Sequence, residues 1–271
     1  MNIKVVNNIN FILILDSGVG GISIFNEIKQ LLPNINYIYC LDNFAFPYGE
    51  KDESFIINRL LTLINKICKI HKLCMVILAC NTASVVGLSA LQLSFPFLIL
   101  GIKPVIELAT RITRNSIIGL LATKTTINSI YIKRLIKKLS SSYTIKVIIA
   151  PQLVLLAEKK MRGHYISKNL ILPIIDCWLY ETNVPDTIIL GCTHFSHLIA
   201  ELKNIFLKNI ILLDGNLILA KTVFSLLQYE NKLFINIHNN IVYYTKFDFN
   251  IFNLQPIFKK LGFDIFKIIN I

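Results

Sequence analysis

Two of the six cysteines stand in the same kind of sequence context. In each, an apolar run ending in one small residue is followed by the cysteine and two polar residues; the segments are 75–82, with Cys80, and 187–194, with Cys192. A thiol just before a helix faces backbone N–H groups and the positive end of the helix dipole, which favour the thiolate. A lone cysteine at a strand end is more often a packed core residue. The repeated context favours chemistry, with each thiolate acting as a base or a nucleophile.

The other cysteines lack this context and are predicted to be core or surface thiols: Cys40, Cys68, Cys74 and Cys177. No paired framework is visible, so we expect reduced thiols in a cytoplasmic protein. The apolar run 11–15 is shorter than the ~7–15 residues of a signal-peptide core, and no export is predicted.

Histidine and carboxylate side chains are candidate proton carriers beside these thiols. His194 lies two residues after Cys192 and is interpreted as its proton partner. A Cys-x-His pair without further suitably spaced ligands is weak support for zinc, so no metal is predicted. His197 is ambiguous, and Glu158, before the turn 162–164, would ordinarily be a solvated carboxylate.

A glycine-rich turn, 16–21, begins with Asp16 and Ser17 and lies between the apolar run 11–15 and a helical pattern. Its carboxylate, hydroxyl and flexible backbone N–H groups suit a carboxylate or phosphate ligand. The turn also resembles a dinucleotide-binding fingerprint with Asp42 as the ribose-binding acid, although Ser23 occupies the third glycine position. A nicotinamide-dependent oxidoreductase is therefore an alternative function.

A second turn, 46–51, would place Tyr48 and the Gly49 amide over the same site, although its turn chemistry alone is mostly structural. Neither a G-x-S-x-G turn nor a P-loop motif occurs, which disfavours a serine hydrolase and a P-loop nucleotide site.

Short continuous apolar runs alternate with helical patterns along the chain, which predicts parallel strands covered on both faces. The expected strands are 11–15, 37–41, 74–79, 97–101, 116–121, 144–149, 187–191, 210–213 and 241–245, with a final apolar stretch 264–269. The expected helices are 22–32, 53–70, 83–94, 104–113, 126–139, 152–161, 167–181, 216–228 and 251–260.

This rhythm predicts two α/β domains, one from 1–101 with 211–271 and the other from 102–210. Because ligands bind beyond the carboxyl ends of parallel strands, both cysteines are expected at one cleft between the domains.

The 271 residues are 54% hydrophobic and 16% charged, with a mean hydropathy of +0.59, which excludes a disordered chain. The uncharged stretch 73–102 is long enough to span a membrane, but polar residues interrupt it, and it is interpreted as strand, helix and strand. The net charge of +12 makes a nucleic-acid-binding protein a second alternative. Lysines scattered among many Ile and Asn residues are more typical of a compositional skew, so no specific nucleic acid is expected.

Four blocks in order make the chain similar to glutamate racemases of the Asp/Glu racemase family. They begin at Asp16, Pro47, Ala79 and Gly191, and read Asp-Ser-Gly-Val-Gly-Gly, Pro-Tyr-Gly-Glu-Lys, Ala-Cys-Asn-Thr-Ala-Ser and Gly-Cys-Thr-His-Phe. The resemblance covers about 12–227. It implies two pseudo-symmetric α/β domains with the substrate between them and cofactor-independent interconversion of L- and D-glutamate, which supplies D-glutamate for peptidoglycan. A racemase of another acidic amino acid, such as aspartate, is the closest alternative.

The resemblance also implies roles for individual residues. Cys80 and Cys192 match the two acid/base cysteines, on the D-glutamate and L-glutamate sides respectively, with Asp16, His194 and Glu158 assisting them. The positions that match substrate contacts are Asp16, Ser17, Tyr48, Gly49, Asn81, Thr82, Thr193 and His194.

Three departures from the family pattern are visible: Thr125 in place of a glycine, Ser196-His197 in place of Pro-Leu, and Gly215-Asn216 in place of Ser-Gly. None replaces an acid/base residue. A second copy of the chain and an activating peptidoglycan precursor, as in some family members, are further candidate partners. These residues do not decide whether either one binds.

Overall fold

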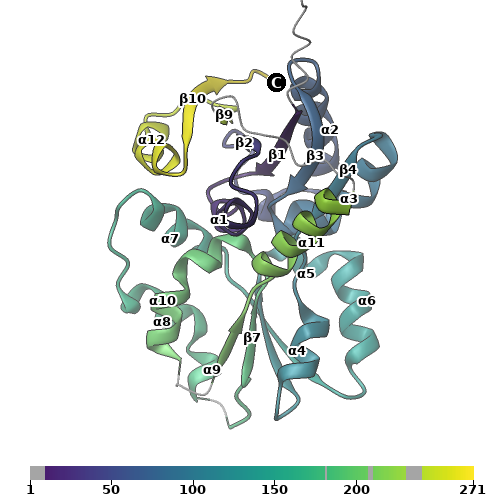
Figure 1. Ribbon diagram of the computed structural model, residues 1–271. Coiled ribbons are helices and arrows are strands. Elements are labelled where there is room, and N and C mark those ends of the chain that lie inside the picture. Colours follow the sequence, from purple (N-terminus) through teal and green to yellow (C-terminus); the bar gives the residue numbers. More distant parts are fainter. Residues whose placement is uncertain (1–9, 181, 207–209, 230–239) are drawn as a thin grey trace, which may run out of the picture.

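The computed structural model describes residues 10–180, 182–206, 210–229 and 240–271 (Figure 1). Residue 181, which ends a predicted helix, and the ranges 1–9, 207–209 and 230–239 of the predicted domains lie outside the described residues.

The first unit is built on a six-stranded parallel sheet with the order β10-β9-β2-β1-β3-β4. Its strands are β1 (Asn10–Asp16), β2 (Asn36–Leu41), β3 (Lys72–Leu78), β4 (Leu98–Gly101), β9 (Asn240–Tyr244) and β10 (Phe263–Ile268). Its helices are α1 (Ile22–Leu31), the 3₁₀ helix η1 (Tyr48–Glu50), α2 (Glu53–Cys68), α3 (Asn81–Ser94), α11 (Asn216–Tyr229) and α12 (Asn250–Lys260). All of β2 is buried, as expected of a parallel strand covered on both faces.

The second unit has a four-stranded parallel sheet with the order β6-β5-β7-β8. Its strands are β5 (Ile117–Ala122), β6 (Thr144–Ile149), β7 (Thr187–Leu190) and β8 (Ile211–Leu213). Its helices are α4 (Ile106–Ile112), α5 (Lys124–Asn128), α6 (Ile130–Leu139), α7 (Pro151–Met161), α8 (Lys168–Ile175), α9 (Cys177–Tyr180), the 3₁₀ helix η2 (Thr193–Leu198) and α10 (Ile199–Ile205).

Two long helices of the prediction are divided in the structure. The helix expected over 126–139 becomes α5 and α6, because Ser129 leaves the helical conformation and its hydroxyl accepts a hydrogen bond from the Ile132 N–H at 3.3 Å. This is a helix cap, a role that serine fills well. The helix expected over 167–181 is divided at Asp176 into α8 and α9.

The two units repeat the same topology. The order β2-β1-β3-β4 in the first sheet corresponds to β6-β5-β7-β8 in the second. In each repeat, the chain reaches its candidate cysteine just after the third strand, β3 or β7. The predicted class, two parallel-sheet α/β domains, is therefore confirmed, and the sequence similarity around the cysteines reflects equivalent places in the two sheets.

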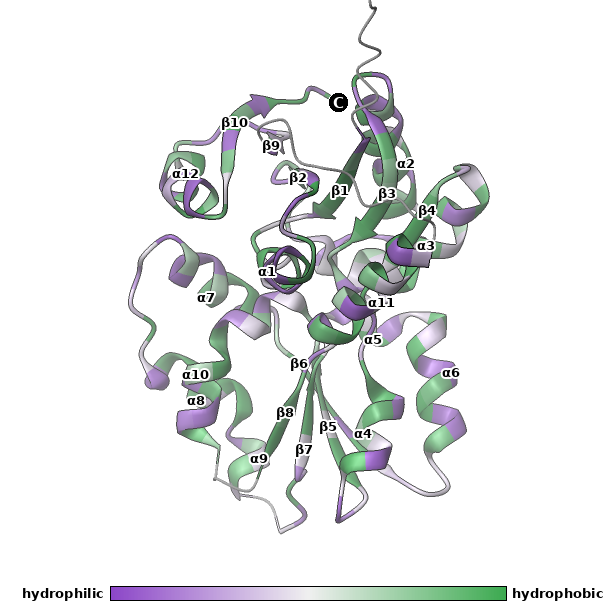
Figure 2. Ribbon diagram, in the orientation of Figure 1, coloured by the Kyte–Doolittle hydropathy of each residue, from purple (hydrophilic) through white to green (hydrophobic). Residues whose placement is uncertain are grey.

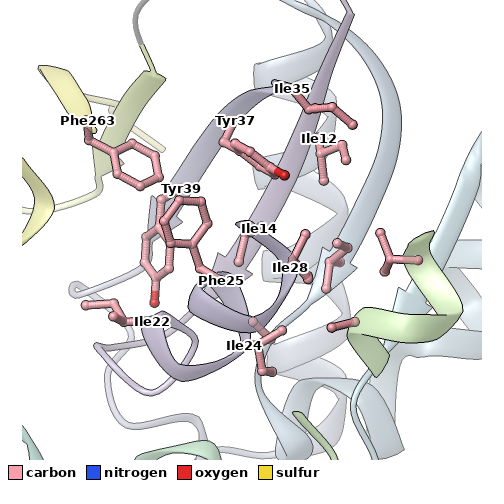
Figure 3. Packing of buried hydrophobic residues seen from close by; sticks show 14 of the residues in the cluster. Ile12, Ile14, Ile22, Ile24, Phe25, Ile28, Ile35, Tyr37, Tyr39 and Phe263 are labelled. Carbon is pink, nitrogen blue, oxygen red and sulfur yellow. The ribbon is translucent and has the colours of Figure 1, made fainter. Parts of the chain in front are cut away.

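Hydrophobic residues dominate the strands of both sheets, as the green colouring of Figure 2 shows, and buried apolar side chains pack between the sheets and their helices. On one face of the first sheet, the buried rings of Phe25, Tyr37, Tyr39, Phe258 and Phe263 pack together. Figure 3 shows Phe263 of the C-terminal strand reaching the aromatic side chains of β2 and α1. The C-terminal segment thus completes the core of the N-terminal unit.

The chain returns to the first unit after β8. Because β8 pairs with β7 in the second sheet while α11 packs on α1, we propose that the first domain resumes after Leu213 and not after residue 210. Figure 1 shows α11 lying where the two units meet. The other predicted domain limits, at 101 and 102, stay a prediction.

Replacing Phe263 by alanine is expected to lower the free energy of unfolding by ~3–5 kcal/mol, because a fully buried ring leaves a cavity among other rings. Urea unfolding followed by circular dichroism measures this change. Phe249→Ala removes a ring that is 79% exposed and is the matched control, with less than ~1 kcal/mol expected. Equal losses in the two variants would contradict a core role for the C-terminal strand.

Candidate active site

The candidate acid/base residues gather at the carboxyl ends of three parallel strands. Asp16 is the last residue of β1, and Cys80 and Cys192 each lie two residues beyond β3 and β7. The two cysteines precede α3 and η2 in extended conformation, and each is 6% exposed. Hydrogen bonds between the two units surround them, so the site lies at the interface of the units, where parallel α/β sheets bind ligands.

Cys80 and Asp16 share one environment. Burial, followed by the charges of Asp16 and Cys192, raises the pKa of the Cys80 thiol well above its ordinary value, and the N–H groups of Ala83 and Thr82 partly offset this. Burial also raises the pKa of Asp16 to about 6. The proton of Asp16 is therefore exchangeable close to neutral pH, whereas Cys80 rests as a thiol.

Cys192 has a different set of partners. Its Sγ lies 3.8 Å from His194 Nδ1, and the other ring nitrogen of His194 lies 2.8 Å from Glu158 Oε1. Burial alone would lower the pKa of His194, but hydrogen bonds with Cys192 and Glu158 raise it well above the ordinary value. Glu158 also forms an ion pair with Arg162.

The charged state of Glu158 is strongly favoured. Although burial acts to raise its pKa, the hydrogen bond and charge of His194, followed by Arg162 and the Val19 N–H, lower the pKa to about 2. The negative charge of Glu158 stabilises the protonated form of His194. A protonated His194 can donate a hydrogen bond to a Cys192 thiolate.

The glycine-rich turn after β1 packs closely against Glu158 and His194. A Cβ on Gly18 would lie 2.2 Å from Glu158 Oε1 and 2.7 Å from His194 Nε2, so only glycine fits there. The Tyr39 hydroxyl donates to the Gly18 carbonyl at 2.9 Å, and the Val19 N–H donates to Glu158 Oε1 at 2.8 Å. The turn is thus fixed by groups from both units.

The predicted substrate contacts lie around the same interface. Thr193 donates to Asp16 Oδ2 at 3.3 Å, and the Ser17 hydroxyl donates to Asp16 Oδ1 at 3.4 Å. The side-chain oxygen of Asn81 is buried and accepts no hydrogen bond from the described residues. Thr82 forms a triangle of hydroxyl hydrogen bonds with Thr123 and Thr126, at 2.9 to 3.0 Å. The binding roles of these residues stay predictions.

The turn 46–51 packs against Asp42 and Thr123. The Tyr48 hydroxyl is buried and donates to Asp42 Oδ2 at 2.6 Å, so it faces Asp42. Gly49 packs closely on Thr123, where a Cβ would lie 2.6 Å from the threonine side chain. The substrate contacts predicted for Tyr48 and Gly49 are not tested by these distances and stay predictions.

Asp42 does not serve as a ribose ligand. It is fully buried, its carboxylate forms a two-pronged ion pair with Arg59 at 2.7 and 2.9 Å, and Thr245 donates to it at 2.7 Å. The Ser23 hydroxyl, at the third position of the fingerprint, donates to the Gly20 carbonyl. This arrangement does not support the dinucleotide alternative.

Several contributing residues are missed by the sequence motifs. Arg162 lies one helical turn beyond Glu158, a spacing that suits an ion pair, although the sequence pattern places it only in the turn 162–164. Tyr39 and Thr123 lie outside the four blocks, and no local pattern marks them; Thr126 matches a threonine of the family pattern. The neighbours of Glu158 correct its local interpretation as a solvated carboxylate, since it is 7% exposed.

The three departures from the family pattern all make hydrogen bonds where the units meet. The Thr125 hydroxyl donates to the Gly49 carbonyl at 2.8 Å, and His197 contacts the Val19 carbonyl at 2.9 Å. Ser196 and Asn216 contact each other at 3.2 Å, and both donate to Asp214. Two of the departures are therefore neighbours in space.

Within the part of the chain that the structure describes, no group of three or more His, Cys, Asp or Glu side chains could hold a metal ion. Among the same residues, no helix is both long and apolar enough for a membrane span.

The fold and the site define a two-domain α/β enzyme of the amino-acid racemase class, with a pair of thiols at its domain interface. Residues 12–223 match the model of the Asp/Glu/Hydantoin racemase family. The chain belongs to this family, and it is an isomerase.

Individual relatives agree with this assignment. A glutamate racemase of Buchnera aphidicola from Acyrthosiphon pisum (strain APS) is 46% identical over 96% of this chain and 99% of its own length. The glutamate racemase of Photorhabdus laumondii is 42% identical over 90% of this chain and 85% of its own length. A crystal structure of Escherichia coli glutamate racemase in complex with L-glutamate and the activator UDP-MurNAc-ala has a TM-score of 0.91. It is 36% identical and covers 96% of this chain and 98% of its own.

Asp16→Asn is expected to make the protein more stable at pH 8. Because burial raises the folded-state pKa of Asp16 from 3.8 to about 6, its contribution to stability is complete below pH 3.8 and is lost as the pH rises through 6. Removing the ionised group should raise the free energy of unfolding by ~1–3 kcal/mol at pH 8. Urea unfolding at pH 8 and pH 4 measures this.

The gain of Asp16→Asn should vanish at pH 4, where Asp16 is protonated. The exposed Asp176, replaced by asparagine, is the matched control and should show no gain at either pH. A loss of stability in Asp16→Asn at pH 8 would contradict the assigned direction of the Asp16 shift.

Proposed function

We propose that this chain interconverts L- and D-glutamate without a cofactor, with Cys80 and Cys192 as the two acid/base groups. It would supply D-glutamate for peptidoglycan from the cytoplasm. The observation that carries the proposal is the equivalent placement of the two thiols beyond β3 and β7, each buried and each with its own proton partner. The names of the relatives, and the L-glutamate in the Escherichia coli structure, support glutamate as the substrate.

Racemisation requires removal of the α-proton from one face of the substrate and return of a proton to the other. A single base would have to exchange its proton with water between the two steps, whereas two opposed thiols need no exchange. One enters the cycle as thiolate and leaves as thiol, and the other does the reverse. The pair therefore holds one proton in the resting enzyme.

The surroundings of the thiols set the direction of the first step. Cys80 rests as a thiol because burial and Asp16 raise its pKa, and Cys192 faces a protonated His194 that suits a thiolate. Cys192 is then ready to remove the proton of L-glutamate, and Cys80 to donate one on the opposite face. For D-glutamate, Asp16 first accepts the Cys80 proton, with its pKa near 6, and the protonated His194 gives its proton to Cys192. The Cys80 thiolate then removes the α-proton, and the Cys192 thiol donates one on the opposite face.

The substrate carboxylates need donors that carry no competing negative charge. Asn81, Thr82, Ser17 and Thr193 supply neutral polar groups, and the N–H groups at the starts of α3 and η2 supply backbone donors. In a buried site such fixed dipoles stabilise the negative charge that develops on the α-carboxylate during proton transfer.

Two partner assignments accompany this function. Activation by UDP-MurNAc-ala, the activator in the Escherichia coli structure, is part of the proposal. The homodimer stays a prediction. Circular dichroism of L-glutamate, with and without UDP-MurNAc-ala and with no other cofactor, tests the activity directly; the same assay with L-aspartate tests the closest alternative substrate.

Cys80→Ala and Cys192→Ala should each lower the rate of racemisation by at least ~10³-fold, because each removes a proton carrier but little volume. The loss of optical rotation of L-glutamate and of D-glutamate measures this. Cys68→Ala, at a free thiol outside the site, is the matched control and should retain activity. Full activity in either site variant would refute the two-thiol mechanism.

In deuterated water, the wild-type protein should place deuterium mainly in the product enantiomer, since separate groups serve the two faces. Cys80→Ala should exchange the α-proton of L-glutamate without racemising it, because Cys192 still serves that face. Proton NMR of each recovered enantiomer, early in the reaction, measures both. Equal early labelling of substrate and product by the wild type would favour one exchanging base.

A further inference from the structure

We propose that His197 is a positioning residue that clamps the glycine-rich turn of the first unit onto the second unit, and so holds Glu158 and His194 behind Cys192. This inference rests on the proposed function and adds to it a residue that touches neither a thiol nor an acid/base side chain directly.

The contacts of His197 close a circuit of hydrogen bonds. Its Nε2 donates to the Val19 carbonyl at 2.9 Å, and the N–H of the same Val19 donates to Glu158 Oε1 at 2.8 Å. Glu158 Oε1 also pairs with His194 Nε2 at 2.8 Å. Both backbone groups of one buried residue are therefore held by side chains of the other unit.

The geometry of η2 places both imidazoles toward this turn. In a 3₁₀ helix, residues three apart lie on the same face, so His194 and His197 project from η2 in the same direction. The turn fits closely against them, since a Cβ on Gly20 would lie 2.6 Å from His194 Nδ1. The two imidazoles thus hold the turn at two points. His194 does so through Glu158, and His197 bonds directly to the Val19 carbonyl.

The protonation state of His197 suits a fixed donor. Burial, with the nearby cations His194 and Lys160, lowers the pKa of His197 to about 4, and Glu158 and the Val19 carbonyl oppose this only in part. The ring is neutral at physiological pH, and its contact with a carbonyl oxygen places the remaining proton on Nε2. The clamp therefore does not titrate in the working range of the protein.

The clamp acts on one half of the reaction. The circuit passes through Glu158 and His194 to Cys192, whereas the proton partner of Cys80 is Asp16. Loss of the His197 hydrogen bond should loosen Glu158 and His194 and slow proton transfer at Cys192. Transfer at Cys80 should change less, because Asp16 keeps its hydrogen bonds with Gly18 and Thr193.

The test compares His197→Leu with His197→Gln, whose amide can restore an N–H donor at a similar reach. His197→Leu should lower kcat/KM by about tenfold, equivalent to ~1.4 kcal/mol. The two enantiomers have equal free energies, so kcat/KM must fall by the same factor in both directions. Isotope effects therefore distinguish the two thiols.

With α-deuterated L-glutamate, whose deuteron leaves to Cys192, the primary isotope effect of His197→Leu should increase. With α-deuterated D-glutamate it should decrease, because the slowed transfer at Cys192 then follows the removal of the deuteron by Cys80. His197→Gln should restore kcat/KM to within about threefold of the wild type. His71→Leu, which removes the hydrogen bond to Tyr243 away from the site, is the matched control and should change neither isotope effect. Isotope effects that rise equally for both enantiomers, or kcat/KM within twofold of wild type, would overturn the clamp.

Hydrogen exchange provides a measurement that does not need activity. Without substrate, the peptide containing Val19 should exchange at least about fivefold faster in His197→Leu than in the wild type, and at the wild-type rate in His197→Gln. Unchanged exchange in His197→Leu would refute the clamp even in an active enzyme. Faster exchange in a protein that does not racemise glutamate would support the clamp and refute the proposed function.

Discussion

A buried carboxylate, Glu158, joins the two units at the candidate active site. It lies on α7 of the second unit, and it accepts hydrogen bonds from its own His194 and from the Val19 N–H of the first unit. A buried charge of this kind is tolerated only when its partners are complete. Arg162 and a protonated His194 supply the opposite charge, and the Val19 amide is available only when the units are together. The active arrangement and the satisfaction of this carboxylate therefore depend on the same contact.

The topology explains why such a contact can be built from short segments. In both sheets the strands run parallel, so their carboxyl ends, and the helix starts that follow, lie along one edge. Repetition of the order β2-β1-β3-β4 as β6-β5-β7-β8 places Cys80 and Cys192 at equivalent positions. Their partners differ because the loops differ: β1 ends in Asp16, whereas the corresponding β5 is followed by Thr123. The repeated scaffold supplies two thiols, and the unequal loops give them unequal proton partners.

Sequence reasoning could predict the features that are local. The apolar runs predict both parallel sheets, and the two cysteine segments predict the site thiols and His194. These features can be predicted because the ends of strands and the starts of helices are encoded by residues close together in the sequence. The partners of Glu158 are 36 positions away at His194 and 139 positions away at Val19, so its own surroundings could indicate only a solvated side chain. The helical pattern does not predict the break at Ser129, because a serine inside such a pattern is a cap only if the backbone bends there. The resemblance to the family identified Glu158, but not His197, whose contact with Val19 exists only in three dimensions.

The two carboxylates of the site have opposite shifts, and this difference divides their chemical roles. Both are buried, yet the pKa of Asp16 is raised to about 6 and that of Glu158 is lowered to about 2. Asp16 receives hydrogen bonds from two hydroxyls and a backbone amide, and the charge of His194 offsets its burial only in part; among the described residues it forms no ion pair, whereas Glu158 pairs with Arg162 and His194. A carboxylate that titrates near neutral pH can take and return a proton in each turnover. One that stays ionised cannot, but it fixes the charge of the histidine beside it. In the proposed mechanism, the preference for proton transfer from L-glutamate to Cys192 thus originates in which carboxylate forms ion pairs with neighbouring cations.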